Sequence, residues 1–181
     1  MQEPNYTKIT EQWVRTVVVE LNLCPFAAEP LSQGRIRYVV CEESEPEAIY
    51  RALLLEMEGM LSLPEAEVET SLLVVPQGLA SFESYLSLLY SAEEAVLEVG
   101  LEGILQLASF HPDYCFEGVA QNDPANYTNR SPFPMFHLIR EASLERALSS
   151  YPNPELIPQR NIEKLRSLGL TEIQRRLHLC G

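Results

Sequence analysis

The chain reads RIRYVVCE at residues 35–42, SLLVVP at 71–76 and ILQLASF at 104–110, and each short apolar run predicts a β-strand. Two helical segments lie between these strands. The first begins at Glu45-Pro46 and continues to about Leu63, and the second covers 81–98 and stops before Gly100. A strand–helix–strand–helix–strand order favours right-handed crossovers and therefore a largely parallel sheet.

The flanking segments predict mainly helices. Residues 7–22 carry apolar side chains four apart, and CPFAAEP (24–30) predicts a turn or a single helical turn. A further short strand is expected at 115–119, a helix from Ser131-Pro132 to about Ser150, and two short helices at 158–168 and 171–179. The predicted fold is α/β, a single globular domain over residues 1–181. It has a small, largely parallel sheet of three to four strands flanked by about six helices, with ligands expected beyond the carboxyl ends of the strands.

Composition restricts the class of protein. The 181 residues are 46% hydrophobic, which indicates a globular protein. No apolar run is long enough to span a membrane, and the first residues lack the pattern of a secretory signal, so we expect a cytoplasmic protein. The four cysteines are widely spaced and are expected to be reduced.

The charge is unevenly distributed. Residues 52–129 contain no Lys or Arg but 13 Asp and Glu, in a chain whose net charge is −13. Such a surface repels polyanions, so neither nucleic acid nor a membrane is expected as a partner.

Both aspartates and two of the three histidines lie in one segment, HPDYCFEGVAQNDPANYTNRSPFPMFH (111–137). Its turn-forming residues, imidazoles and aromatic side chains predict a shaped polar loop, and long loops of this kind are often functional. His111 directly follows the third strand, so we expect the loop to form a site at that edge of the sheet.

His137 and Glu141 are four residues apart on the predicted helix after the loop, so they share one face. Three interpretations are open. They could orient a general base, bind a divalent metal together with His111 or Asp123, or form a buried structural pair.

Arg130 and Arg140 are the first basic residues after residues 52–129, the stretch that contains no Lys or Arg. Arg130 precedes the predicted helix, where backbone N–H groups favour an anion, and Asn126, Asn129 and Ser131 add donors. Arg130 could instead bond Asp113 or Asp123 and brace the loop.

Cys24 precedes Pro25 and is a candidate N-cap, a position where backbone N–H groups favour a thiolate. A nucleophilic thiol also needs a base, and His111 is the candidate partner. The alternative is a buried structural thiol.

The chain resembles the bacterial and plastid protein family known as domain-of-unknown-function family 1415. The runs that carry the resemblance are WVRTVVVELNLCPFA (13–27), RIRYVV (35–40), ETSLLVVP (69–76), LASFHPDYCFEG (107–118), DPANYTNRSPFPMFHLIREAS (123–143) and IPQRNIEKLRSLG (157–169). The family pattern has Gln where this chain has Cys115, so Cys115 is left out of the predicted site. The resemblance directs attention to Asn22, Cys24, Pro25, His111, Pro112, Asp113, Asp123, Asn126, Asn129, Arg130, Ser131, His137, Arg140 and Glu141, and it transfers no catalytic role.

The leading hypothesis is a hydrolase or transferase that acts on a small anionic metabolite. Its predicted catalytic residues are His111, Cys24, His137 and Glu141, and its predicted substrate-binding residues are Arg130, Arg140, Asp123, Asn126, Asn129 and Ser131. The alternatives are a non-catalytic ligand-binding or interaction module and a divalent-metal-binding protein. The sequence specifies no cofactor and no oligomeric state.

Overall fold

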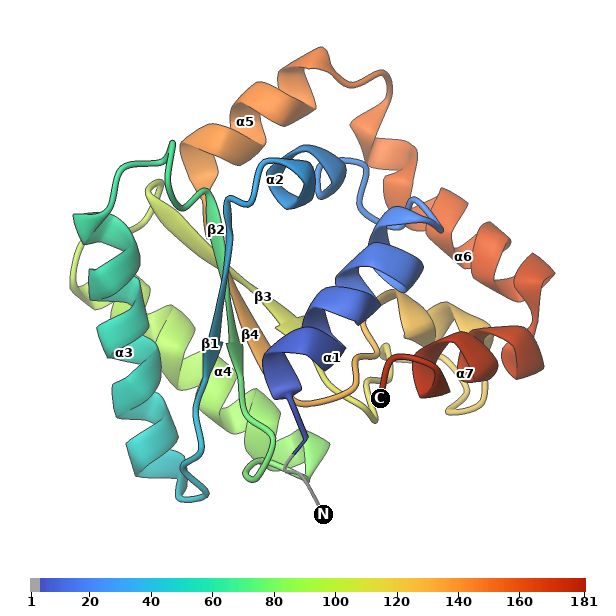
Figure 1. The fold of residues 1–181 in the computed structure, drawn as a ribbon, viewed down its shortest axis with the longest axis horizontal. Coiled ribbons are helices and arrows are strands. Elements are labelled where there is room, and N and C mark those ends of the chain that lie inside the picture. The colour runs from blue at the N-terminus through green and yellow to red at the C-terminus, as the bar shows by residue number, and fades with distance from the viewer. Residues whose placement is uncertain (1–3) are drawn as a thin grey trace.

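The computed structural model describes residues 4–181, and a four-stranded mixed sheet forms its centre (Figure 1). The strands are β1 (Ile36–Val40), β2 (Thr70–Val74), β3 (Leu105–Phe110) and β4 (Met135–Arg140), in the order β1-β2-β4-β3. Only β1 and β2 pair in parallel, because β4 runs antiparallel to both of its neighbours. The prediction of a largely parallel sheet is therefore wrong, although the α/β class is confirmed.

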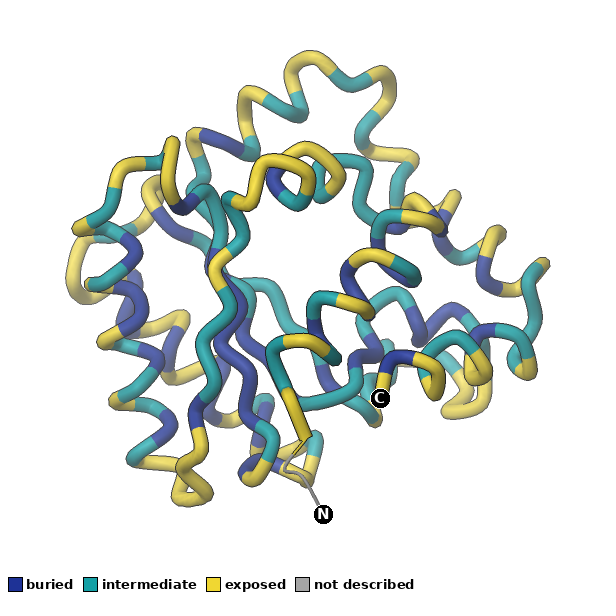
Figure 2. Tube along the Cα trace, in the orientation of Figure 1, coloured by how far each residue is buried: buried dark blue, intermediate teal, exposed yellow. Residues whose placement is uncertain are grey.

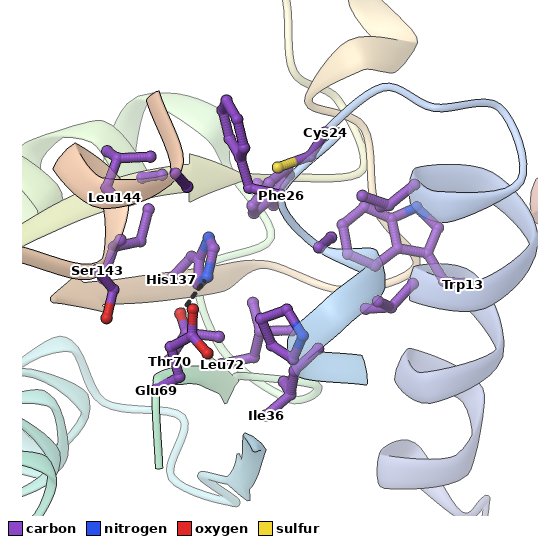
Figure 3. A pocket seen from close by; sticks show the side chains of 18 residues that line it. Trp13, Cys24, Phe26, Ile36, Glu69, Thr70, Leu72, His137, Ser143 and Leu144 are labelled. Carbon is purple, nitrogen blue, oxygen red and sulfur yellow. Dashed lines mark hydrogen bonds between the residues drawn. The ribbon is translucent and has the colours of Figure 1, made fainter. Parts of the chain in front are cut away.

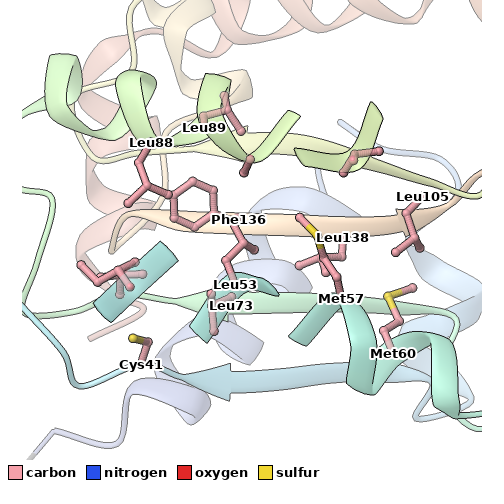
Figure 4. Close-up of a cluster of buried hydrophobic side chains, with 14 of the residues drawn as sticks. Cys41, Leu53, Met57, Met60, Leu73, Leu88, Leu89, Leu105, Phe136 and Leu138 are labelled. Atoms are coloured by element: carbon pink, nitrogen blue, oxygen red, sulfur yellow. The ribbon is translucent and has the colours of Figure 1, made fainter. Parts of the chain in front are cut away.

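The two predicted crossover helices are present. They are α3 (Pro46–Ser62), with proline in its first turn, and α4 (Phe82–Glu98), in which the Ser81 hydroxyl accepts a hydrogen bond from the Ser84 N–H. Both helices pack on the same face of the sheet (Figure 1). Leu53, Leu73, Phe136 and other buried side chains fill the space between these two helices and the sheet (Figure 4).

The opposite face is covered by segments from both ends of the chain. The N-terminal helix α1 (Tyr6–Trp13) and a π-helical turn η1 (Val14–Val19) pack on the sheet, and the C-terminal helices α6 (Ile157–Leu168) and α7 (Leu170–His178) lie beyond them, against η1 and residues 124–128 (Figure 1). Trp13, Val17, Leu165 and Ile173 belong to one cluster of buried apolar side chains, which these elements share with the sheet. The central strands are consequently buried on both faces (Figure 2).

Two further helices lie at the end of the sheet where β1 begins and β4 ends (Figure 1). They are α2 (Ala28–Ser32) and α5 (Glu141–Ser150). Two 3-10 helices, η2 (Pro124–Thr128) and η3 (Pro154–Leu156), complete the elements. The described residues thus form seven α-helices, against about six predicted.

Two local predictions are wrong. No strand forms over 115–119, and residues 135–140 form β4 instead of the first half of a helix. Within the described part of the chain, every helix is too short or too polar to cross a membrane.

Candidate functional site

A cavity of about 220 Å³ lies on the face of the sheet that α1 covers (Figure 3). Strands β1 to β4 form its floor, and α1, η1, α2 and α5 contribute its walls. Thirteen of its 18 lining side chains are apolar. The polar lining residues are Cys24, Glu69, Thr70, His137 and Ser143.

The cavity does not lie where the sequence placed the site. It extends from Ile36 and Thr70, the first residues of β1 and β2, to Phe110, the last residue of β3, and stops before the loop that follows. Among the described residues, none from 111–134 lines the cavity. The cavity and the polar residues of the loop therefore lie at different places in the structure.

His137 occupies the middle of the cavity floor. It lies on β4, opposite Leu72 of β2 and Ala108 of β3, and both of these neighbours also line the cavity. Because residues directly opposite one another across a sheet project from the same face, the strand pairing turns the imidazole toward α1.

The hydrogen bonds of Thr70 define the tautomer of His137. Thr70 Oγ1 donates its one proton to the carbonyl of Leu138 at 2.7 Å. The same oxygen lies 2.5 Å from His137 Nε2 and must therefore accept a hydrogen bond from it. The proton of the neutral ring is on Nε2, so Nδ1 carries a lone pair. Within the described residues the ring is hydrogen-bonded through Nε2, and Nδ1 faces the cavity on the side of Cys24 and Phe26 (Figure 3).

Burial holds the His137 ring neutral. Removal of the ring from water lowers its pKa from 6.5 to about 4, because the charged imidazolium loses hydration that the apolar walls do not replace. Near neutral pH the side chain is a hydrogen-bond acceptor facing an apolar space.

Cys24 reaches the same cavity from the segment that joins η1 to α2 (Figure 3). Burial raises the pKa of its thiol, and hydrogen bonds from the backbone N–H groups of Phe26 and Ala27 partly oppose that effect. Two residues of α6 fix this segment: Asn161 Nδ2 donates to the Leu23 carbonyl at 2.7 Å, and Lys164 Nζ donates to the Leu21 carbonyl at 2.8 Å.

Glu69 contributes the carboxylate of the cavity lining. Its Oε2 lies 2.8 Å from Arg35 Nη1. Burial is the main influence on this carboxyl and raises its pKa, while the charge of Arg35 acts in the opposite direction.

His111 lies elsewhere, and the prediction that it shares a site with Cys24 and His137 is wrong. Its ring packs against Phe82 and Tyr85 of α4, on the other side of the sheet. Nε2 donates to the Leu79 carbonyl at 2.9 Å, and Nδ1 accepts from the Asp113 N–H at 3.0 Å. Desolvation lowers the pKa of this imidazole. Both ring nitrogens are engaged by the backbone, so the ring braces the start of the loop.

Glu141 does not pair with His137. It is the first residue of α5, and its backbone N–H donates to the Ile104 carbonyl at 3.0 Å. Because His137 lies on a strand, the four-residue spacing does not place the two side chains on one face, and Glu141 is not among the cavity-lining residues.

The two predicted anion-binding arginines bind backbone carbonyls instead. Arg130 donates to the carbonyls of Tyr114 and Gln121, at 2.9 and 2.8 Å, and lies over the ring of Tyr127. Arg140 donates to three carbonyls near the carboxyl end of α3, those of Met60, Leu63 and Val68. Both guanidinium groups therefore have structural partners.

The remaining predicted binding residues hold the loop together. Asn126 is fully buried: its side chain accepts from the Phe116 N–H and donates to the carbonyls of Ala120 and Gln121. Asp123 caps η2 and pairs with Arg166 at 2.8 Å. Asn129 Nδ2 donates to the Ser109 carbonyl, and the Ser131 hydroxyl donates to the Phe133 carbonyl. The loop is a well-braced structural segment.

The proposed metal ligands are separated as well. His111 and His137 lie on different sides of the sheet, and residues 4–181 contain no group of three or more His, Cys, Asp or Glu side chains arranged to hold an ion. The structure thus offers no support for the metal-binding alternative.

Sequence reasoning missed Thr70, which orients His137, and Trp13, which forms part of the cavity wall. Residues 135–140 read MFHLIR, an apolar segment that fits a strand as well as a helix, so the sequence alone did not fix the direction of His137. No local signal connects Thr70 with a histidine 67 residues away.

Fold and cavity together define an α/β protein with a four-stranded mixed sheet and an apolar internal pocket. The chain belongs to the family described as protein of unknown function (DUF1415), whose family model matches residues 5–175, so the predicted family membership is confirmed. Comparisons with curated proteins and with solved structures found no match.

Proposed function

We propose that this protein binds a small, uncharged and mainly apolar molecule in the cavity, and that Nδ1 of His137 accepts a hydrogen bond from it. The observation that carries the proposal is the neutral imidazole whose free lone pair faces a largely apolar cavity. Binding sites for small molecules commonly combine hydrophobic walls with a few placed polar groups.

The size of the cavity limits the ligand. Dry apolar cavities of about 150 Å³ can bind benzene. The present cavity, at about 220 Å³, accommodates a somewhat larger body such as two fused rings or a short branched chain.

Charge argues against the anionic metabolite expected from the sequence. All 18 lining residues belong to the described chain, and none is Lys or Arg. The guanidinium of Arg35, which contacts the lining residue Glu69, is also paired with Glu29. An anion would lose hydration without gaining a counter-charge, so an uncharged ligand is favoured.

A matched series of ligands tests the proposal. Naphthalene, 2-naphthol and 2-naphthoate share one ring system and differ in having no polar group, a hydroxyl donor or a charge. By equilibrium dialysis near neutral pH, 2-naphthol should bind about fivefold more tightly than naphthalene, since one added hydrogen bond contributes about 1 kcal/mol. The carboxylate should bind most weakly.

Three variants locate the binding. His137→Phe should abolish the preference for 2-naphthol while retaining naphthalene. Ala147→Phe should block all three ligands, because Ala147 lines the cavity. Ala142→Phe is the control, since Ala142 lies on the same helix α5 but is exposed and does not line the cavity. Equal binding of the three ligands, or unchanged binding by Ala147→Phe, would contradict the proposal.

Two predictions from the sequence accompany this proposal. The acidic surface, with a net charge of −13, supports the absence of nucleic-acid partners. The second is a cytoplasmic location, which we propose for the ligand-binding protein on the sequence features described above.

A further inference from the structure

We propose that Cys24 and His137 act as nucleophile and general base in acyl transfer from a small uncharged ester or thioester. The acyl chain of the substrate would occupy the apolar cavity. The inference rests on the proposed function, because the substrate must first bind in that cavity.

The arrangement of the two side chains carries the proposal. Cys24 comes from the segment before α2 and His137 from β4, yet both line one cavity, and the free Nδ1 of His137 lies on the side of Cys24 (Figure 3). A catalytic thiol requires a base that is itself oriented by a third group. Thr70 is that positioning residue, since it accepts from Nε2 and thereby keeps the lone pair on Nδ1.

The backbone around Cys24 adds a second feature. The backbone N–H groups of Phe26 and Ala27 lower the pKa of the Cys24 thiol, against the larger rise that burial causes. At rest both partners are neutral, since burial raises the pKa of the thiol and lowers that of the imidazole to about 4. Proton transfer must therefore accompany attack.

The steps balance without a cofactor. Sγ of Cys24 bonds to the acyl carbon while its proton moves to Nδ1 of His137, and the bond from carbon to the leaving oxygen or sulfur breaks. The leaving group takes the proton from Nδ1 and departs as an alcohol or thiol. Water then attacks the thioester and gives a proton to Nδ1; the carbon–sulfur bond breaks, the acid leaves, and the proton returns to Sγ.

Two other cysteines provide a comparison. The thiol of Cys115 donates to the carbonyls of Phe116 and Val119, and that of Cys180 donates to the Arg176 carbonyl. Neither lines the cavity, so neither faces His137. Cys115→Ala is therefore a suitable control.

p-Nitrophenyl butyrate tests the inference with the full chain. Release of p-nitrophenolate should be accompanied by one butyryl group per chain, detected by mass spectrometry and located on the peptide that contains Cys24. Cys24→Ala and Cys24→Ser should form no thioester, and Cys115→Ala should react as the wild type does. His137→Gln should slow acylation about 100-fold or more, as expected for loss of a general base.

Binding measurements separate this inference from the proposed function. Cys24→Ala should still bind 2-naphthol, which also shows that the variant is folded. If the wild type binds 2-naphthol but is not acylated, or if Cys24→Ala is acylated at the same rate, the acyl-transfer inference is wrong and the binding proposal stands. If the wild type binds none of the naphthyl ligands, both proposals fail.

Discussion

Acidification should weaken this fold in part through one side chain on the cavity floor, His137. In the unfolded chain a histidine takes up a proton near pH 6.5, whereas in the folded protein burial delays this to about pH 4. Between these values the unfolded state binds the extra proton. The free energy of unfolding therefore rises with pH across this window and falls as the pH is lowered.

The size of the effect follows from the two pKa values. Each tenfold change in a protonation constant corresponds to about 1.4 kcal/mol. The difference between 6.5 and about 4 thus corresponds to about 3 kcal/mol, which is lost as the pH falls from about 7 to about 4. This is a large fraction of the stability of an ordinary domain.

Urea unfolding, followed by circular dichroism at several pH values, measures the effect as a difference between the wild type and His137→Gln. Glutamine retains an N–H that can reach Thr70 but does not titrate. Burial lowers the pKa of His111 and raises those of Glu69 and Glu93, and these groups are present in both proteins. Their contributions cancel in the difference.

His178 provides the matched control, because it is an exposed histidine at the end of α7. His178→Gln should follow the wild-type curve. If the wild type and His137→Gln lose the same free energy of unfolding between about pH 7 and about pH 4, the cavity does not hold the imidazole neutral, and the argument for a buried acceptor is refuted.

Three further variants test structural roles by urea denaturation. Arg140→Ala should lower the free energy of unfolding by about 3 kcal/mol, because three carbonyls near the end of α3 lose a charged donor; stability equal to the wild type would contradict this role. Asn126→Ala should cost about 2 kcal/mol through unpaired buried backbone groups in the loop. Asn161→Ala should cost a similar amount, about 2 kcal/mol, and should also weaken ligand binding, since Asn161 holds the segment that carries Cys24.

Much of the fold was predictable because its signals are local. The apolar runs that became β1, β2 and β3, and the proline and serine at the starts of α3 and α4, specify their own segments. Strand β4 was missed because Ser131-Pro132 is a typical helix start, and MFHLIR fits either a buried helix or a buried strand. Pairing with both β2 and β3 decides between them, and that pairing is a tertiary contact.

The site was predictable only in part, for the same reason. Cys24 and His137 stood out by residue type, and they line one cavity. His111, Arg130 and Arg140 stood out equally, but backbone carbonyls and N–H groups engage them. A sequence shows which side chains are capable of chemistry, whereas only the folded backbone shows which of them are already bonded.

The π-helical turn η1 has a consequence for how this part of the chain tolerates a change in length. In such a turn the N–H of Glu20 bonds the carbonyl of Arg15, five residues earlier, so the turn holds one residue more than an α-helix would. Because the turn absorbs this residue, deletion of one valine from Val17–Val19 would leave a regular α-helix whose flanking residues keep their faces. Trp13 would then keep its place in the cavity wall, so a length change of one residue in this turn is absorbed without loss of the ligand space.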